Sequence, residues 1–337
     1  MSQRLHLALG EGGLVLPASG RIGVFHPRPE HDLTPLGRDR VDVVQPFFPA
    51  YRHFETAGYH ARPDLARTAD QAGSSSLFAA SVVFLPRAKA LARSLLSDAA
   101  KSTSGAVIVD GAKTDGIDSV LKEMRKRTAI GGVISKAHGK LFWFDASDAE
   151  LSDWQPDTML ADGFRTAPGV FSADGIDPAS RLLADALPEK IGGAVGDLGA
   201  GWGYLSARLL EREGITTLHL VEADHAALSC ARANISDPRG QVHWADVLDW
   251  AAPERLDAVV MNPPFHTGRR AEPDLGRGFI AAAARALAPS GRLWMVANRH
   301  LPYETHLQTH FAESGEFGGD GRFKLLRAAR PRRVNHR

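Results

Sequence analysis

The sequence predicts an α/β protein made of two tandem domains, each built on a mostly parallel, doubly wound sheet. Two observations lead to this prediction. The chain has 337 residues, which is about two domains at roughly 100–200 residues each. In both halves, short runs rich in β-branched residues alternate with longer stretches of helical periodicity, and parallel neighbouring strands need such crossover helices.

The composition is that of an ordinary globular protein, with 44% hydrophobic and 23% charged residues. It excludes fibrous, collagenous and wholly disordered chains. The sole cysteine, Cys230, cannot form an internal disulfide, and no run approaches the ~18 apolar residues of a membrane-spanning helix. Glu11 and Gly12 interrupt the apolar start before a signal sequence can form. We therefore expect a cytoplasmic protein without a membrane segment.

The N-terminal half contains the expected strands of a first domain, and one amphipathic helix is clear in RAKALARSLLSDAA. The strand runs are GRIGVFHP, VDVVQPFF, SLFAASVVFLP, GAVIVDG and GKLFWFD. Residues 145–167 are rich in Asp, Pro and Ser and are the expected linker. We accordingly expect domains at residues 1–150 and 151–337.

The second half shows five strand runs separated by helical stretches. In order they are AVGDL, TLHLVEAD, QVHWAD, LDAVVMN and GRLWMVAN. Ligands of such sheets bind beyond the carboxyl ends of the strands, so we expect the functional residues to follow these runs.

A glycine-rich turn follows the first of these strands, from Asp197 through Gly199 and Gly201 to Gly203. Glycine lets the backbone turn sharply and approach a ligand that a Cβ would exclude. Tyr204 stands where a dinucleotide fingerprint needs its third glycine or alanine, and no G-K-[ST] follows. The turn thus favours a nucleoside without phosphates.

Carboxylates follow three neighbouring strands. Glu222 ends the next strand, where a carboxylate can accept hydrogen bonds from both ribose hydroxyls. Asp246 closes the third strand, where it could accept from an adenine amino group, and Asp197 lies beside the turn. Each acid alone is also typical of a solvated strand end. Together they favour a cationic ligand, and a sulfonium with an α-amino group describes S-adenosylmethionine.

The fourth strand ends in Asn262-Pro263-Pro264-Phe265. The prolines fix the backbone, so that the Asn262 side chain and the Pro263 carbonyl can serve as two rigid acceptors for an exocyclic NH₂. Phe265 can stack on the flat ring that carries this amine. A stiff turn with a core phenylalanine is the alternative interpretation of the same residues.

These motifs, in this order, resemble those of the class I S-adenosylmethionine-dependent methyltransferases, and NPPF marks the branch that methylates planar amines. The flanks APGVFSADGIDPASRLLADAL, RLWMVANRHLPY and GRFKLLRA resemble the bacterial ribosomal RNA guanine-N2 methyltransferases. The branch that acts on the small subunit is most similar, and the large-subunit branch shares most motifs. The resemblance implies methylation of the N2 amine of a specific guanine in 16S ribosomal RNA, with ribosomal RNA or the small subunit as partner and a monomeric enzyme.

The resemblance also implies two Rossmann-like domains, of which the N-terminal one is degenerate. No glycine turn follows GRIGVFHPRPEHD, and no NPPF-like tetrapeptide occurs before residue 150. That domain would then serve as a scaffold and in RNA docking, with the basic residues 121–127 as a phosphate contact. In the catalytic domain, Phe171 would lie against the cofactor or the base. The base entrance would be lined by Asn298, Arg299, Arg322 and Lys324.

Several alternatives remain open from the sequence. A methyltransferase acting on adenine N6 or on a glutamine amide could use the same acceptor pair, because both substrates are planar amines. A non-catalytic RNA-binding assembly factor could use the same sheet, although it would not need intact glycines and NPPF. The scattered histidines give no pattern of metal ligands, so no metal is expected.

Overall fold

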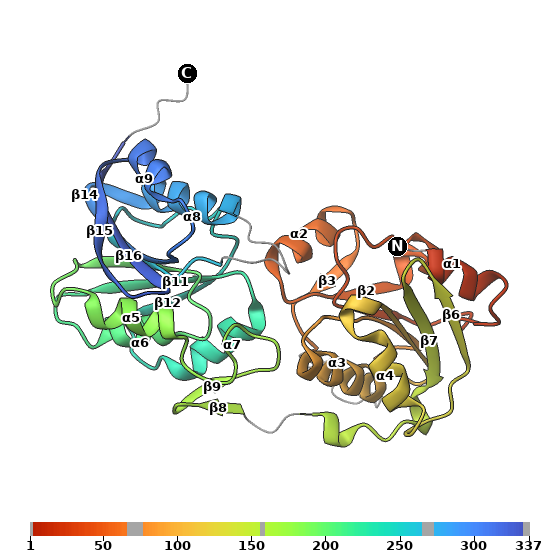
Figure 1. Cartoon of the computed structure of the whole chain (residues 1–337). Coiled ribbons are helices and arrows are strands. Elements are labelled where there is room, and N and C mark those ends of the chain that lie inside the picture. Colours follow the sequence, from red (N-terminus) through yellow and green to blue (C-terminus); the bar gives the residue numbers. More distant parts are fainter. Residues whose placement is uncertain (1–2, 66–76, 156–158, 265–272, 333–337) are drawn as a thin grey trace. The chain divides into compact units, whose positions relative to one another are not determined.

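The computed structural model describes residues 3–65, 77–155, 159–264 and 273–332. The chain divides into two compact units, residues 1–158 and 159–337, so the division falls inside the stretch expected to be a linker. Figure 1 shows the first unit in red to yellow-green and the second in green to blue. Among the described residues, no helix is both long and apolar enough to cross a bilayer.

The first unit contains a seven-stranded sheet in the order β3-β2-β1-β4-β5-β7-β6. The first five strands in this order are parallel, and β7 and β6 form an antiparallel hairpin at the end. The strands are β1 Ile22–Phe25, β2 Val41–Val44, β3 His60–Arg62, β4 Ala80–Phe84, β5 Ala106–Ala112, β6 Gly132–Lys136 and β7 Gly139–Asp145. The helices are α1 Gln3–Gly10, α2 Phe48–Thr56, α3 Lys89–Ser102 and α4 Ile117–Met124.

The second unit repeats this topology, with the order β12-β11-β10-β13-β14-β16-β15 and the same antiparallel end. The strands are β10 Ala194–Leu198, β11 Thr217–Glu222, β12 Gly240–Trp244, β13 Leu256–Met261, β14 Leu287–Asn298, β15 Phe311–Gly319 and β16 Phe323–Pro331. The helices are α5 Pro178–Ala186, α6 Tyr204–Leu210, α7 His225–Asn234, α8 Pro273–Ala286 and α9 Glu304–His310. The prediction of two mostly parallel α/β sheets is confirmed.

The central strand β10 is buried along its whole length, because apolar clusters cover both faces of the sheet. One cluster joins the sheet to α5, α6 and α7, and the other joins it to α8 and α9. With both faces of the central strands packed, a ligand of these strands must bind at their ends. Every sequence motif of the second half lies at the carboxyl ends.

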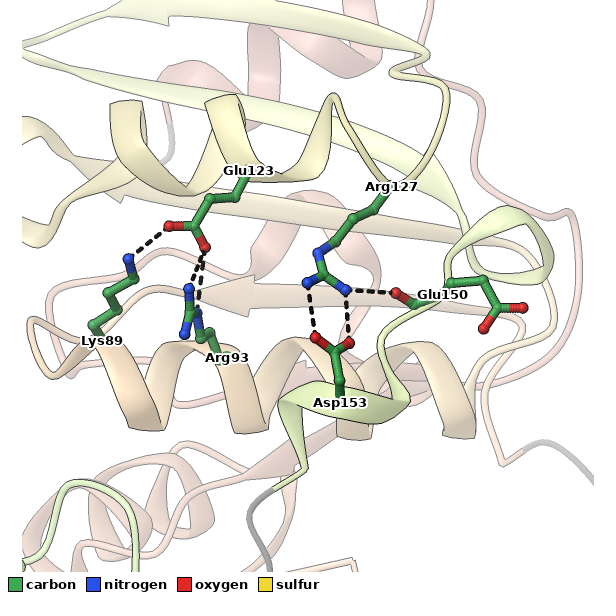
Figure 2. Close-up of polar contacts among 6 residues, drawn as sticks. All are labelled: Lys89, Arg93, Glu123, Arg127, Glu150 and Asp153. Atoms are coloured by element: carbon green, nitrogen blue, oxygen red, sulfur yellow. Dashed lines mark hydrogen bonds and ion pairs between the residues drawn. The ribbon is translucent and has the colours of Figure 1, made fainter.

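The stretch expected to be a linker has structure of its own. It contains short 3-10 helices at Ala146–Asp148 and Ser152–Trp154 and a hairpin of β8 Met159–Ala161 and β9 Phe164–Thr166. Figure 2 shows Arg127 donating to both carboxylate oxygens of Asp153, at 2.6 and 2.8 Å, and to the Glu150 carbonyl at 3.0 Å. The guanidinium also lies over the Trp154 ring. These contacts fix the start of the stretch against the first unit.

In the basic segment 121–127, Asp153 neutralises Arg127, and the segment's own carboxylate, Glu123, pairs with cations outside the segment. Glu123 pairs with Lys89 at 2.6 Å and with Arg93 at 2.8 Å, and Asp153 holds Arg127 (Figure 2). Lys122, Arg125 and Lys126 are exposed and have no ion pair with any described residue. The expectation of a phosphate contact in this segment therefore depends on these three side chains.

Candidate active site

The glycine turn adopts a backbone conformation that residues with a Cβ rarely take. Gly199, Gly201 and Gly203 have φ values of +79°, +55° and +95°, all in the left-handed region. A Cβ at Gly201 would point into open space, with no atom within 4 Å. The turn therefore leaves the surface over Gly201 free for a ligand to approach the backbone.

Glu222 ends β11 beside this turn and is held from two sides. One carboxylate oxygen accepts a hydrogen bond from the Gly201 N–H at 2.8 Å, and the other accepts from the Asp224 N–H at 2.8 Å. Burial raises the pKa of Glu222. Each oxygen has a second lone pair, so the fixed carboxylate can still accept from two ligand hydroxyls.

Asp246 lies two residues beyond β12, which ends at Trp244, earlier than the sequence pattern indicated. Its Oδ1 accepts a hydrogen bond from the Leu248 N–H at 2.9 Å. The side chain is half-buried. The second oxygen is therefore available to a donor at the carboxyl end of the sheet.

Asp197 is placed differently from the other two carboxylates. It has no exposed surface, and its Oδ2 accepts a hydrogen bond from the Ser206 hydroxyl of α6 at 2.7 Å. Oδ1 is buried and has no partner in the part of the chain that the structure describes. Burial, with a contribution from the charge of Glu222, raises the pKa of Asp197 to about 7. Three carboxylates were expected to converge on one pocket; the structure buries Asp197 beside the turn, where it joins the turn to α6, so its contact with a ligand stays a prediction.

The orientation of the Asn262 side chain is chemically determined. Its Nδ2 donates to Asp177 Oδ2 at 2.9 Å and to the Ser180 hydroxyl at 2.8 Å. An ionised carboxylate only accepts hydrogen bonds, so the NH₂ end of the amide must face Asp177. The carbonyl oxygen, Oδ1, is buried and has no partner among the described residues. Asn262 therefore presents a bare acceptor, as an amine-binding site requires.

Asp177 and Ser180 were not foreseen as site residues. Asp177 is the N-cap of α5, where its Oδ2 also accepts from the Ser180 N–H at 2.8 Å, and Pro178 follows at the first helical position. The Asp-Pro pair could have predicted the start of a helix. The contact with Asn262 joins residues 85 positions apart, so no local pattern could reveal it.

Phe171, expected to lie against the cofactor or the base, is placed near Asn262. Both residues line a small cavity of about 40 Å³, together with Asp177, Ser180 and the glycine turn. The Phe171 side chain is 63% exposed, and its carbonyl accepts from the Trp202 indole N–H at 2.9 Å. An exposed ring at the mouth of this cavity is available to a ligand. Phe265, the expected stacking residue, lies outside the described residues.

The residues expected at the base entrance are largely engaged with the protein. Lys324 is buried, and its Nζ donates to Glu304 at 2.5 Å. Arg299 pairs with Glu316 at 3.2 Å and donates to the Asp320 carbonyl at 2.8 Å. Arg322 is exposed over the Phe323 ring, and Asn298 ends β14 opposite Phe323. Of the three cations, only Arg322 is free of an ion pair with the described residues.

The equivalent positions of the first unit differ in chemistry. The His26 N–H donates to Val44, as the Gly199 N–H donates to Val221, which aligns the two units residue by residue. This alignment and the strand registers match His26 to Gly199, Gln45 to Glu222, Phe84 to Asn262 and Val24 to Asp197.

These replacements fill the place that a ligand would take in the first unit. The Gln45 amide donates to the Pro27 carbonyl at 2.6 Å, and the His31 ring stacks on Phe84 at 3.9 Å. Burial lowers the pKa of His26 to about 4 and that of His31 to about 3, so both rings are neutral at pH 7. The first unit therefore shares the strand order of the second unit but has other side chains where the second unit has its candidate site.

The second unit fits S-adenosylmethionine. Gly201 opens the turn, Glu222 has lone pairs for two hydroxyls, and the unpartnered Asn262 Oδ1 lines the cavity beside them. The family model Methyltransferase small domain matches residues 162–327. With the glycine turn and Asn262 at the ends of adjacent parallel strands, this match makes the chain a class I S-adenosylmethionine-dependent methyltransferase.

Comparison with known proteins identifies the family. The chain is 30% identical over 269 residues to ribosomal RNA small subunit methyltransferase C of Hahella chejuensis, covering 74% of this chain and 76% of the relative. It is 32% identical over 293 residues to the protein of that name from Pseudomonas aeruginosa (strain UCBPP-PA14), covering 82% and 86%.

A solved structure agrees over nearly the whole chain. It is the T. thermophilus 16S rRNA N2 G1207 methyltransferase RsmC in complex with AdoMet and guanosine, with a TM-score of 0.79, 28% identity and coverage of 94% of this chain and 90% of that chain. The chain belongs to the ribosomal RNA small subunit methyltransferase C family.

Proposed function

We propose that this chain transfers the methyl group of S-adenosylmethionine to the exocyclic N2 amine of a guanine in 16S ribosomal RNA. The names of the relatives and the guanosine of the T. thermophilus complex support this substrate. The observation that carries the proposal is the buried, unpartnered Oδ1 of Asn262, which Asp177 and Ser180 hold in place. A buried acceptor without a partner costs about 1–3 kcal/mol, and a substrate amine would satisfy it.

The cofactor is held by residues at three strand ends. Glu222 accepts from the ribose hydroxyls, Asp246 accepts from the adenine amino group, and Gly201 admits the ligand close to the backbone. Phe171 covers the same region from the segment before α5. When bound, S-adenosylmethionine supplies an electrophilic methyl group on a sulfonium.

Asn262 prepares the amine for attack. The lone pair of guanine N2 is delocalised into the ring, so the amine is a poor nucleophile. Asn262 Oδ1 and the Pro263 carbonyl accept its two N–H bonds, which turns the lone pair out of the ring plane and favours the geometry of attack. One N–C bond forms as the S–C bond breaks, and the methylated amine then loses a proton to water. Most of the rate comes from holding the amine in line, an effect of about 7–11 kcal/mol in well-oriented systems.

The guanine must be unpaired when it enters. The N2 amine of a paired guanine is engaged in the duplex, and extruding a base costs a few kcal/mol. We therefore propose that an assembly particle with accessible RNA is the substrate, that Phe265 stacks on the base and that Arg322 contacts a phosphate nearby. We also propose that the enzyme works as a monomer, in the cytoplasm with its RNA.

The test is a methylation assay with defined acceptors. The purified chain is incubated with labelled S-adenosylmethionine and, separately, with naked 16S RNA, small subunits and large subunits. We expect label in 16S RNA, recovered as N2-methylguanosine by mass spectrometry of nucleosides. Label found only in large subunits would support a large-subunit methyltransferase. Label in adenine or in protein would support methylation of adenine N6 or of a glutamine amide. No transfer by protein that binds the cofactor would support a non-catalytic assembly factor.

A further inference from the structure

A second hollow lies on the second unit, away from the cofactor turn. It has a volume of about 630 Å³ and is formed by β14, β15, β16 and the end of α5 (Figure 1 labels these elements). Trp294, Gly315 and Phe317 line it, and the guanidinium-bearing side chains of Arg292 and Arg327 belong to its wall. We call it the arginine groove. Its size is within the ordinary range of ligand sites.

The two arginines of the groove are uncompensated. Both are exposed, and neither has a hydrogen bond, ion pair or ring contact with any described residue. The carboxylates that line the groove are already engaged. Glu313 pairs with Arg330 at 3.1 Å, and Glu316 pairs with Arg299 at 3.2 Å. The register also makes Glu313 a diagonal neighbour of Arg327. With the partners Arg299 and Arg330 counted, four arginines face two glutamates here, an excess of two positive charges.

The strand register places the two arginines close together. Trp294 pairs with Arg327 and Arg292 pairs with Ala329, so Arg292 and Arg327 are diagonal neighbours on one face of the antiparallel pair. Diagonal neighbours are about 7–8 Å apart, and like charges at this distance repel. An anion between them removes that repulsion, and planar guanidinium groups match phosphate in two-point hydrogen bonding.

We propose that the arginine groove binds the phosphodiester backbone of the RNA substrate outside the target nucleotide. This inference rests on the proposed function, because it takes RNA as the substrate. Arg292 lies six residues before Asn298, the end of β14, which is roughly 20 Å along an extended strand. The groove therefore contacts RNA beyond the base that enters the active site.

The test is the salt dependence of RNA binding. The affinity for a 16S RNA transcript is measured by filter binding over a series of salt concentrations, for the wild type and for Arg292→Ala/Arg327→Ala. Each lost phosphate contact lowers the slope of log K against log salt by about 0.7–0.9. We expect the double variant to lower it by about 1.4–1.8 and each single variant by about half of that. Arg292→Lys/Arg327→Lys, which keeps both charges, should retain most of the slope.

A matched control removes two arginines that already have protein partners. Arg52 pairs with Glu55 and Arg277 pairs with Asp274, and both are exposed. Arg52→Ala/Arg277→Ala changes the net charge equally and should leave the slope near that of the wild type. The groove variant should also raise KM for RNA while kcat at saturating RNA and affinity for S-adenosylmethionine stay unchanged.

A slope for the groove variant equal to that of the control overturns the proposal. So does a fall in kcat at saturating RNA without a change in slope, which would indicate an effect on the active site. The outcome is separable from the proposed function, because that function fails if the wild type does not methylate 16S RNA, whatever the slopes.

Discussion

The Asn262 amide donates a hydrogen bond to Asp177 Oδ2 at 2.9 Å, and this contact determines which end of the amide faces the substrate. A free asparagine side chain can turn either end toward a partner. With the carboxylate fixed at the N-cap of α5, only the carbonyl oxygen points away from it. Asp177 is therefore a positioning residue for Asn262.

Asp177→Ala should lower kcat by about 10–100-fold, the loss expected for a hydrogen bond to a charged group of about 1.5–3 kcal/mol. Steady-state kinetics with RNA and calorimetry with S-adenosylmethionine check this, and cofactor affinity should change far less than kcat. Asp177→Asn keeps an acceptor oxygen and should recover much of the rate. If Asp177→Asn and Asp177→Ala lower kcat equally, Asp177 acts by stabilising the start of α5 and not by orienting Asn262.

Asn262→Ala should lower turnover by about 100–1,000-fold, the usual effect of removing one preorganised hydrogen-bonding group from a reacting centre. The measurement is single-turnover methylation of RNA, with cofactor affinity as the control for folding. That affinity should remain near the wild-type value because Glu222 and the glycine turn are unchanged. Turnover close to that of the wild type would remove Asn262 from the mechanism.

Glu222→Gln should weaken S-adenosylmethionine binding by at least about tenfold. The carboxylate accepts from the Gly201 and Asp224 N–H groups, and the NH₂ of glutamine cannot accept from either. Losing one such hydrogen bond costs about 1.5–3 kcal/mol. Titration calorimetry measures the affinity directly, and unchanged affinity would contradict the assignment of Glu222 to the ribose.

Asp197 should make the second unit more stable in mild acid than in base. Its pKa is raised to about 7 in the folded protein from 3.8, so the folded state binds the proton more tightly than the unfolded state does. The free energy of unfolding contributed by this group therefore falls as pH rises from about 4 to 7 and is constant above that range. Between pH 5 and pH 8 the change is about 2–3 kcal/mol.

Asp197→Asn removes this dependence. Hydrogen exchange of β10, followed by mass spectrometry, measures the protection of this strand in both proteins. The difference in protection between the variant and the wild type should favour the variant more at pH 8 than at pH 5. An equal difference between the two proteins at both pH values would mean that Asp197 keeps an ordinary pKa.

Gly276→Ala should destabilise the second unit by about 1–3 kcal/mol, the usual cost of overpacking. Gly276 lies in α8, where a Cβ would meet the Tyr303 hydroxyl oxygen at 2.1 Å, and Tyr303 is fully buried. Gly10→Ala is the matched control, because Gly10 is also helical and a Cβ there meets nothing within 4 Å. It should be neutral or slightly stabilising. Thermal unfolding compares the two variants, and equal shifts in Tm would contradict the packing argument.

The sequence predicted those parts of the site that depend on local backbone chemistry. The left-handed glycines, the carboxylate that ends β11 and the Asn-Pro pair after β13 each follow from residues next to one another along the chain. The contact of Asp177 with Asn262 and the ion pair of Lys324 with Glu304 depend on which elements pack together, so they required the structure. The burial of Asp197 could not be predicted either, because an acidic residue at a strand end has the same sequence pattern whether its side chain is buried or exposed.

The family resemblance predicted two similar domains, and the shared strand order confirms them, but the residues themselves show no internal repeat. The apolar residues that form the strands can vary widely without changing the strand order. The more distinctive residues at the strand ends differ between the two units. Gly199 and Asn262 have His26 and Phe84 at the equivalent positions.

Two sheets with one strand order and matching strand registers are the arrangement that the doubling of one gene produces. The first copy differs at its strand ends, and two of those exchanges, Val24 for Asp197 and Phe84 for Asn262, add apolar side chains to its interior. Introducing the site residues of the second unit into the first unit would show how few side chains separate it from an active domain.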